Sequence, residues 1–130
     1  MRKQRPFNFR DRIKSFRYAY SGLKTLWQEE HNARIHLFAT FCAVLMAIMT
    51  KIAFTGWVFL LFVIALVWIC ELFNTAIENL CDKISLEKDT RIKKVKDLSA
   101  AAVLVSSILA LIVGALLFLP PLIYSFKQLL

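Results

Sequence analysis

Glycine and proline are scarce in this 130-residue chain, which contains three of each. The three glycines, Gly22, Gly56 and Gly114, stand far apart in the sequence. The chain therefore has neither a P-loop nor a glycine-rich kinase loop, both of which need closely spaced glycines to approach a phosphate. A soluble nucleotide-binding fold of either kind is excluded.

Cysteine and histidine are equally sparse. The three cysteines form no C-x-x-C pair, and their number is odd, so we expect small buried apolar side chains rather than disulfides or a metal site. His31 and His36 are five residues apart, which is not the i, i+4 spacing of a helical ligand pair. We expect them to be polar residues at a membrane interface.

Acidic residues are outnumbered, with 9 Asp and Glu against 17 Lys and Arg and a net charge of +8. The chain is also 58% hydrophobic, with a mean hydropathy of +0.58, too apolar for an ordinary soluble domain. A nucleic-acid-binding protein would share the basic charge but not three long apolar segments. The composition indicates an integral membrane protein. The segment before Ile35 holds no apolar core of a secretory signal, so the first spanning helix is expected to direct insertion.

The pattern predicts one all-α membrane domain over 1–130, with spanning helices at about 31–50, 54–82 and 97–119. The short break at 51–56 predicts a tight antiparallel hairpin, and Pro120-Pro121 is expected to end the last helix. An amphipathic helix is expected over about 9–27, where an apolar stripe repeats every three to four residues. This stripe is formed by Phe9, Ile13, Phe16, Tyr20, Leu23 and Trp27. The helix either lies in the membrane interface or packs on the spanning helices, and both are compatible.

The basic residues are distributed unevenly. Nine Lys and Arg lie between Met1 and Arg34 and six in the 83–96 connection, whereas the 51–56 turn and the C-terminal tail hold one each. By the positive-inside rule, the N-terminus and the charged connection are expected on the cytoplasmic side.

A charge-free stretch from 54 to 69 is followed by Glu71, Asn74, Glu78 and Asp82. These spacings place the four polar groups on one side of a helix, with the three acidic residues within about 40° of one another. The 17 residues before Glu71 rise about 25 Å, against a hydrocarbon core of about 30 Å. Glu71 is therefore expected at the inner edge of the core, with Glu78 about 10 Å further on. Glutamates at such a depth are costly, which indicates a functional use.

The chemistry available at this interface favours phosphoryl transfer. Glu30, Glu78 and Asp82 offer oxygens for Mg²⁺, Lys96 offers charge for a polyphosphate, and Glu71 could accept a proton from a lipid hydroxyl. Two other interpretations remain open from the residues alone. One is a small proton-coupled membrane transporter, and the other is a non-catalytic adaptor whose carboxylates serve as interhelical hydrogen-bond partners.

Three blocks of the sequence together resemble a known family, in order and with matching spacing over about residues 10–120. They are Glu30-x-Asn32-x-Arg34-Ile35-His36, Glu71-x-x-Asn74-Thr75-Ala76-Ile77-Glu78-x-x-x-Asp82, and Lys96-Asp97 followed by a helix with Val103-Leu104-Val105. The family that they resemble is the small prokaryotic diacylglycerol kinases, which include the undecaprenol kinases of Gram-positive bacteria.

This resemblance implies a homotrimer in the bacterial cytoplasmic membrane, with cytoplasmic active sites shared between subunits. It implies transfer of the γ-phosphate of ATP, with Mg²⁺, to a lipid alcohol. Glu71 would be the general base, and Glu30 and Glu78 the metal ligands. The ATP-binding residues that it implies are Glu30, Asn74, Glu78, Glu87, Lys96 and Asp97.

The block from Glu30 to His36 favours undecaprenol as the acceptor, which would give undecaprenyl phosphate for recycling of the cell-wall carrier lipid. Diacylglycerol, giving phosphatidic acid, is the alternative. The run Leu98-Ser99-Ala100-Ala101-Ala102 lacks the glycine common in the family after the Lys-Asp pair. This departure weakens the transfer of family roles to Ser99 or Ala100.

Overall fold

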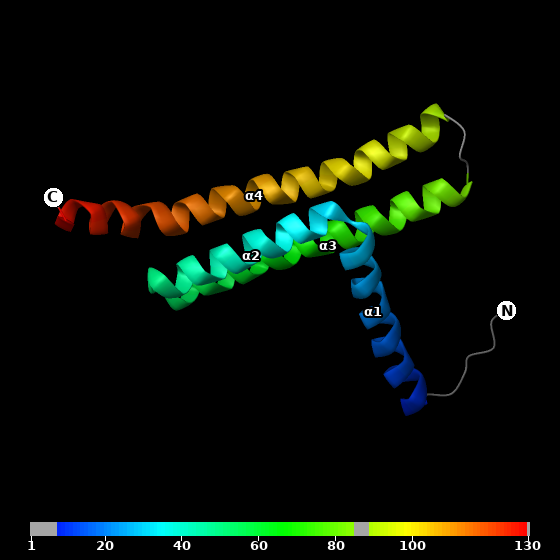
Figure 1. Ribbon diagram of the computed structural model, residues 1–130, viewed down its shortest axis with the longest axis horizontal. Helices are drawn as coiled ribbons and strands as arrows, with labels where there is room; N and C mark the ends of the chain where they lie inside the picture. Colours follow the sequence, from blue (N-terminus) through cyan, green and yellow to red (C-terminus); the bar gives the residue numbers. More distant parts are fainter. Residues whose placement is uncertain (1–7, 85–88, 130) are drawn as a thin grey trace.

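The computed structural model describes residues 8–84 and 89–129, which form four helices and no strand. The helices are α1 (Phe9–Glu29), α2 (His31–Met49), α3 (Phe54–Ile84) and α4 (Thr90–Leu129). Helices α2, α3 and α4 run alongside one another, whereas α1 leaves this bundle at a steep angle (Figure 1). Helices α2, α3 and α4 are each long and apolar enough to cross a membrane, so the expected fold class is confirmed.

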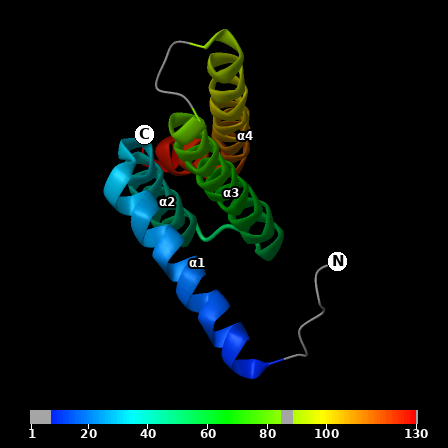
Figure 2. The ribbon, with the colours of Figure 1, turned by 90° about the vertical axis from the view of Figure 1, so that its right-hand side faces the viewer.

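Helix α1 is amphipathic but packs little on the rest of the chain. Its N-terminus is capped by Asn8, whose Oδ1 accepts the N–H of Arg10 at 3.1 Å. On the apolar stripe, Phe9 and Phe16 are 71% and 78% exposed, whereas Leu26 near the C-terminal end is buried. The chain's own helices therefore cover only that end of α1, which projects outward along the rest of its length (Figure 2). The exposed stripe suits a position in the membrane interface.

A sharp elbow at Glu30 separates α1 from α2. Glu30 has extended backbone angles, φ −105° and ψ 119°, and its N–H donates to the carbonyl of Leu26 at 3.0 Å. The Arg34 guanidinium donates to the carbonyls of Trp27 and Gln28 at 3.4 and 3.3 Å. These carbonyls end α1 without helical partners, so Arg34 stabilises the elbow by satisfying them.

The α2–α3 connection is a tight hairpin, as expected. The Thr50 hydroxyl donates to the Met46 carbonyl at 2.7 Å, and Lys51 turns the chain with a positive φ of 49°. Beside this turn, Ala47 of α2, Leu60 of α3 and Phe118 of α4 form a buried apolar cluster that joins all three spanning helices.

The last helix is longer than the spanning segment expected at 97–119, and the expected end at Pro120-Pro121 is wrong. Helix α4 begins at Thr90 because the Asp89 carboxylate caps it, accepting the N–H of Arg91 at 2.6 Å. At the other end α4 continues through Pro120 and Pro121 to Leu129. Proline has a helical φ, so the chain can stay helical, although two N–H donors are missing and each ring crowds the carbonyl one turn earlier.

The cluster at the hairpin end gives a stability prediction. Ala47 has no exposed surface, so Ala47→Leu would force extra methyl groups between Leu60 and Phe118. We expect the free energy of unfolding to fall by about 1–3 kcal/mol, measured by titration with a denaturing detergent in mixed micelles. Ala65→Leu, on the exposed side of α3, is the matched control and should change the stability little. Equal stability of the two variants would contradict this packing.

Candidate active site

Glu71 lies in α3 and is fully buried. Neither carboxylate oxygen has a hydrogen-bond partner among the described residues, and the same holds for the buried Thr75 hydroxyl one turn along. His36 of α2 lies beside Glu71, with Nε2 3.8 Å from Glu71 Oε2. Buried polar atoms normally find partners, so the Glu71 oxygens have unused capacity to accept a hydrogen bond.

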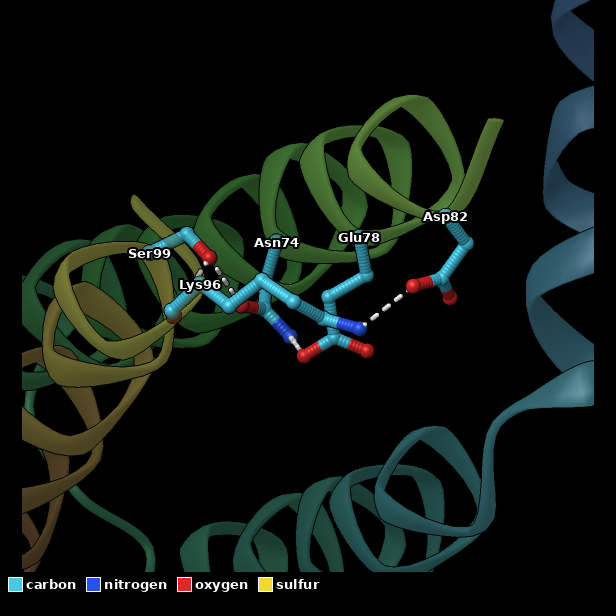
Figure 3. Close-up of polar contacts among 5 residues, drawn as sticks. All are labelled: Asn74, Glu78, Asp82, Lys96 and Ser99. Carbon is cyan, nitrogen blue, oxygen red and sulfur yellow. Dashed lines mark hydrogen bonds and ion pairs between the residues drawn. The ribbon is translucent and has the colours of Figure 1, made fainter. Parts of the chain in front are cut away.

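One turn beyond Glu71, a connected polar network links α3 to α4 (Figure 3). The Asn74 amide donates from Nδ2 to Glu78 Oε1 at 3.1 Å. Its carbonyl oxygen accepts the Ser99 hydroxyl at 2.7 Å. At the outer end, Lys96 Nζ donates to Asp82 Oδ1 at 2.7 Å. The polar face that the spacing predicts on α3 therefore exists, and α4 supplies its partners.

Exposure increases along this face of α3. Glu71 is completely buried, Asn74 is 6% exposed, and the Asp82 side chain is 59% exposed. The helix rises about 10 Å between Glu71 and Glu78. The face therefore has a buried carboxylate at one end and a solvated ion pair at the other.

A third carboxylate comes from the elbow. Glu30 stands between α1 and α2, and α1 contacts both α2 and α3. The elbow therefore adds a carboxylate near the helix pair that carries the polar face.

Glu30 and Glu78 fit a magnesium ion by the chemistry of their donors. Mg²⁺ prefers carboxylate oxygens and usually takes one or two from a protein, with water and phosphate oxygens completing its shell. Within residues 8–84 and 89–129, no three Asp, Glu, His or Cys side chains form a ready-made metal site.

The remaining predicted site residues divide into two groups. Lys96 belongs to the network through Asp82. Asp97, in contrast, is 61% exposed and pairs with Lys93 of its own helix, so the structure does not bring it into the network. Glu87 lies outside the described residues, and its role stays a prediction.

Two residues of this region were given no role by the sequence pattern. His36 was expected to be an interfacial polar residue, but it lies beside the buried Glu71. Ser99 is buried and bonds Asn74 across the helix pair. Its position three residues after Lys96, on the same side of a helix, was the only available signal.

An apolar groove of about 620 Å³ begins beside His36 and extends between α2, α3 and α4. Its polar end contains His36 and Thr40, and Thr40 accepts the indole N–H of Trp68 at 3.2 Å. The rest is apolar except for Ser107 and includes small residues such as Ala43 and Gly114. His36 thus lies both at the end of the groove and within 3.8 Å of Glu71.

Comparison with known proteins gives one consistent match. The model of the family described as prokaryotic diacylglycerol kinase matches residues 17–118, a range that includes every residue of the network and the elbow. The chain is 36% identical to a diacylglycerol kinase of Synechocystis over 110 residues, 84% of this chain and 63% of that protein. The chain thus spans less than two thirds of that relative's length.

Two further relatives are covered almost completely. An undecaprenol kinase of Bacillus subtilis is 31% identical over 110 residues, which are 85% of this chain and 89% of that protein. A diacylglycerol kinase of Escherichia coli is 33% identical over 105 residues, 81% of this chain and 86% of that protein.

The different surroundings of Glu71 and Asn74 predict opposite effects on stability. Glu71→Gln removes a buried charge that has no hydrogen bond within the described structure, so we expect stability equal to or above that of the parent. Asn74→Ala leaves two groups without their partner and should lower the free energy of unfolding by about 1–3 kcal/mol. Detergent-titration unfolding measures both variants. A large loss of stability in Glu71→Gln alone would contradict these surroundings.

Proposed function

The chain belongs to the prokaryotic diacylglycerol kinase family, a family of lipid kinases, and we propose that it transfers the γ-phosphate of ATP to the hydroxyl of a membrane lipid. The observation that carries this proposal is the buried Glu71 carboxylate, which has no hydrogen-bond partner among the described residues and lies beside the end of an apolar groove. A lipid hydroxyl would complete its hydrogen bonding.

In this proposal Glu71 is the general base. Its buried carboxylate accepts the hydrogen bond of the lipid hydroxyl and then its proton, while the apolar groove holds part of the lipid tail. His36, 3.8 Å from Glu71, limits where that hydroxyl can lie. A general base must be within hydrogen-bond reach of the proton it removes, so the lipid hydroxyl would have to pass His36, the groove residue that lies 3.8 Å from Glu71.

The nucleotide end of the site lies toward Glu78 and the elbow. Glu30 and Glu78 would hold Mg²⁺, which when bound neutralises phosphate charge and positions the γ-phosphate. Asn74 holds the Glu78 carboxylate by the 3.1 Å hydrogen bond. Lys96 would exchange its Asp82 partner for a phosphate oxygen, and Asp97 and Glu87 would contact the nucleotide from the start of α4 and the preceding connection.

We assign undecaprenol as the acceptor, with diacylglycerol as the alternative. The block from Glu30 to His36 supports the first, because it resembles the undecaprenol-kinase branch of the family. The product would be undecaprenyl phosphate, the carrier lipid of cell-wall synthesis. Diacylglycerol also presents a hydroxyl at the interface, and it is named as the substrate of the Synechocystis and Escherichia coli relatives.

The proposed orientation places the α1 elbow and the α3–α4 connection at the cytoplasmic side of the membrane. Fifteen of the 17 Lys and Arg residues lie between Met1 and Arg34 or in the 83–96 connection, which supports this orientation. The proposed assembly is a homotrimer with sites shared between subunits. The exposed apolar faces of α2, α3 and α4 are available for lipid or neighbouring subunits.

Replacement of the base gives the sharpest test of the mechanism. Glu71→Gln should lower kcat by about 10²–10⁴-fold, because the amide keeps the side-chain shape but accepts no proton. The KM for ATP should change little, since nucleotide contacts lie elsewhere. Radiolabelled phosphate transfer into lipid measures both. Glu29→Gln, at an exposed position next to the elbow, is the control. Unchanged turnover in Glu71→Gln would refute the base assignment.

Competition between acceptors tests the choice of lipid. The purified protein, in bilayer discs containing equal amounts of undecaprenol and diacylglycerol, is supplied with MgATP. We expect undecaprenyl phosphate to be the main product, because the elbow block favours that branch of the family. A preference for diacylglycerol would establish the alternative, and no phosphorylated lipid from either would overturn the proposed function.

A further inference from the structure

The Ser99 hydroxyl is the only described side-chain group of α4 that bonds Asn74 of α3. It lies 2.7 Å from Asn74 Oδ1 and 2.9 Å from the carbonyl oxygen of Lys96 in its own helix. Ser99 and Asn74 are 8% and 6% exposed, so water competes little for this bond. A serine hydroxyl has one proton, and the shorter distance favours donation to Asn74.

The Glu78 carboxylate determines the direction of both hydrogen bonds that run from Ser99 through Asn74 to Glu78. The Glu78 carboxylate can only accept, so Asn74 must turn its NH₂ group toward Glu78. The Asn74 carbonyl oxygen then necessarily faces Ser99, which must donate. A flipped amide, with its oxygen and nitrogen exchanged, would set the Asn74 oxygen against the Glu78 oxygen. The Glu78 carboxylate therefore selects one of the two amide orientations, and the Ser99 hydroxyl holds the amide in that orientation by donating to its oxygen.

The selected orientation determines how Glu78 is presented. Its Oε1 is held by Asn74, while the second oxygen points away from that bond (Figure 3). Ser99 also lies one turn after Lys96, so a single residue connects the carboxylate on α3 with the α4 turn that carries the lysine. Loss of the hydroxyl would leave the charge of Glu78 intact but its position less defined.

We propose that Ser99 is a positioning residue that orients the Asn74 amide and thereby holds Glu78 for the metal–nucleotide complex. This inference rests on the proposed function, in which Glu78 is a metal ligand. Ser99 lies in the run after Lys96-Asp97, where this sequence departs from the family pattern, and the inference gives its buried hydrogen bond a role. Ser99 acts through Asn74 and does not itself touch a reactant.

The test uses two variants and a matched control. Ser99→Ala removes the hydroxyl, whereas Ser99→Thr retains it. Ser106→Ala is the control, because Ser106 is also buried in α4 but its hydroxyl bonds the Val103 carbonyl of the same helix, at 2.9 Å. Binding is measured by electron paramagnetic resonance of Mn²⁺, titrated with a non-hydrolysable β,γ-imido analogue of ATP. This measurement requires no lipid turnover.

Loss of one neutral hydrogen bond should weaken Mn²⁺–nucleotide binding by about two- to tenfold in Ser99→Ala. The KM for MgATP should rise by a similar factor, the KM for the lipid should stay unchanged, and Ser99→Thr should restore both values. Equal binding by Ser99→Ala and Ser106→Ala would overturn the positioning role. A parent protein that binds no Mn²⁺–nucleotide would overturn the proposed function together with it.

A measurement on the parent protein keeps the proposal testable if Ser99→Ala does not fold. Nuclear magnetic resonance reports how fast the side-chain NH₂ protons of asparagines exchange with water. Asn74 should exchange much more slowly than Asn79, which is exposed on the same helix. Equal exchange at the two residues would show that the Asn74 amide is not held.

Discussion

The burial of Glu71 is the constraint on which the other features of the site depend. The Glu71 carboxylate has no exposed surface, and it has no hydrogen-bond partner in the described part of the chain. Its burial is therefore destabilising, and the apolar side chains around it do not offset this cost. The cost is tolerable only because the apolar contacts of α3 with α2 and α4 hold the helix in place regardless. The unpaired carboxylate is thus held by a helix whose position depends on apolar packing.

In the proposed reaction, depth along a single helix separates the two reactants. The helix rises about 10 Å between Glu71 and Glu78, and exposure increases from the buried Glu71 to the Asp82 side chain. A lipid hydroxyl would meet the buried end and a charged phosphate the open end. In this proposal a glycine-rich loop is unnecessary, since side chains of α3, α4 and the elbow would supply the polar groups that such a loop provides through its backbone.

The sequence was sufficient for the helices and for the polar face of α3, because hydropathy and the 3.6-residue period are local properties. It failed at Pro120-Pro121, where local preference predicted an end but the fixed helical φ of proline let α4 continue. It gave no role to His36 or Ser99, because their importance arises from Glu71 and Asn74, which are distant from them in the chain. Such contacts depend on how helices pack, which periodicity in one segment does not encode.

That packing also determines the chemistry. Helix α4 meets α3 more extensively than any other pair of helices in the described structure, and Ser99 reaches Asn74 only at the rotation that this contact imposes. A shift of one residue would turn the Ser99 side chain by about 100°, away from α3, and Asn74 would lose the donor that orients it. The apolar contacts between α3 and α4 therefore affect the site even where they do not touch it. They set the register in which one hydroxyl, one amide and one carboxylate align.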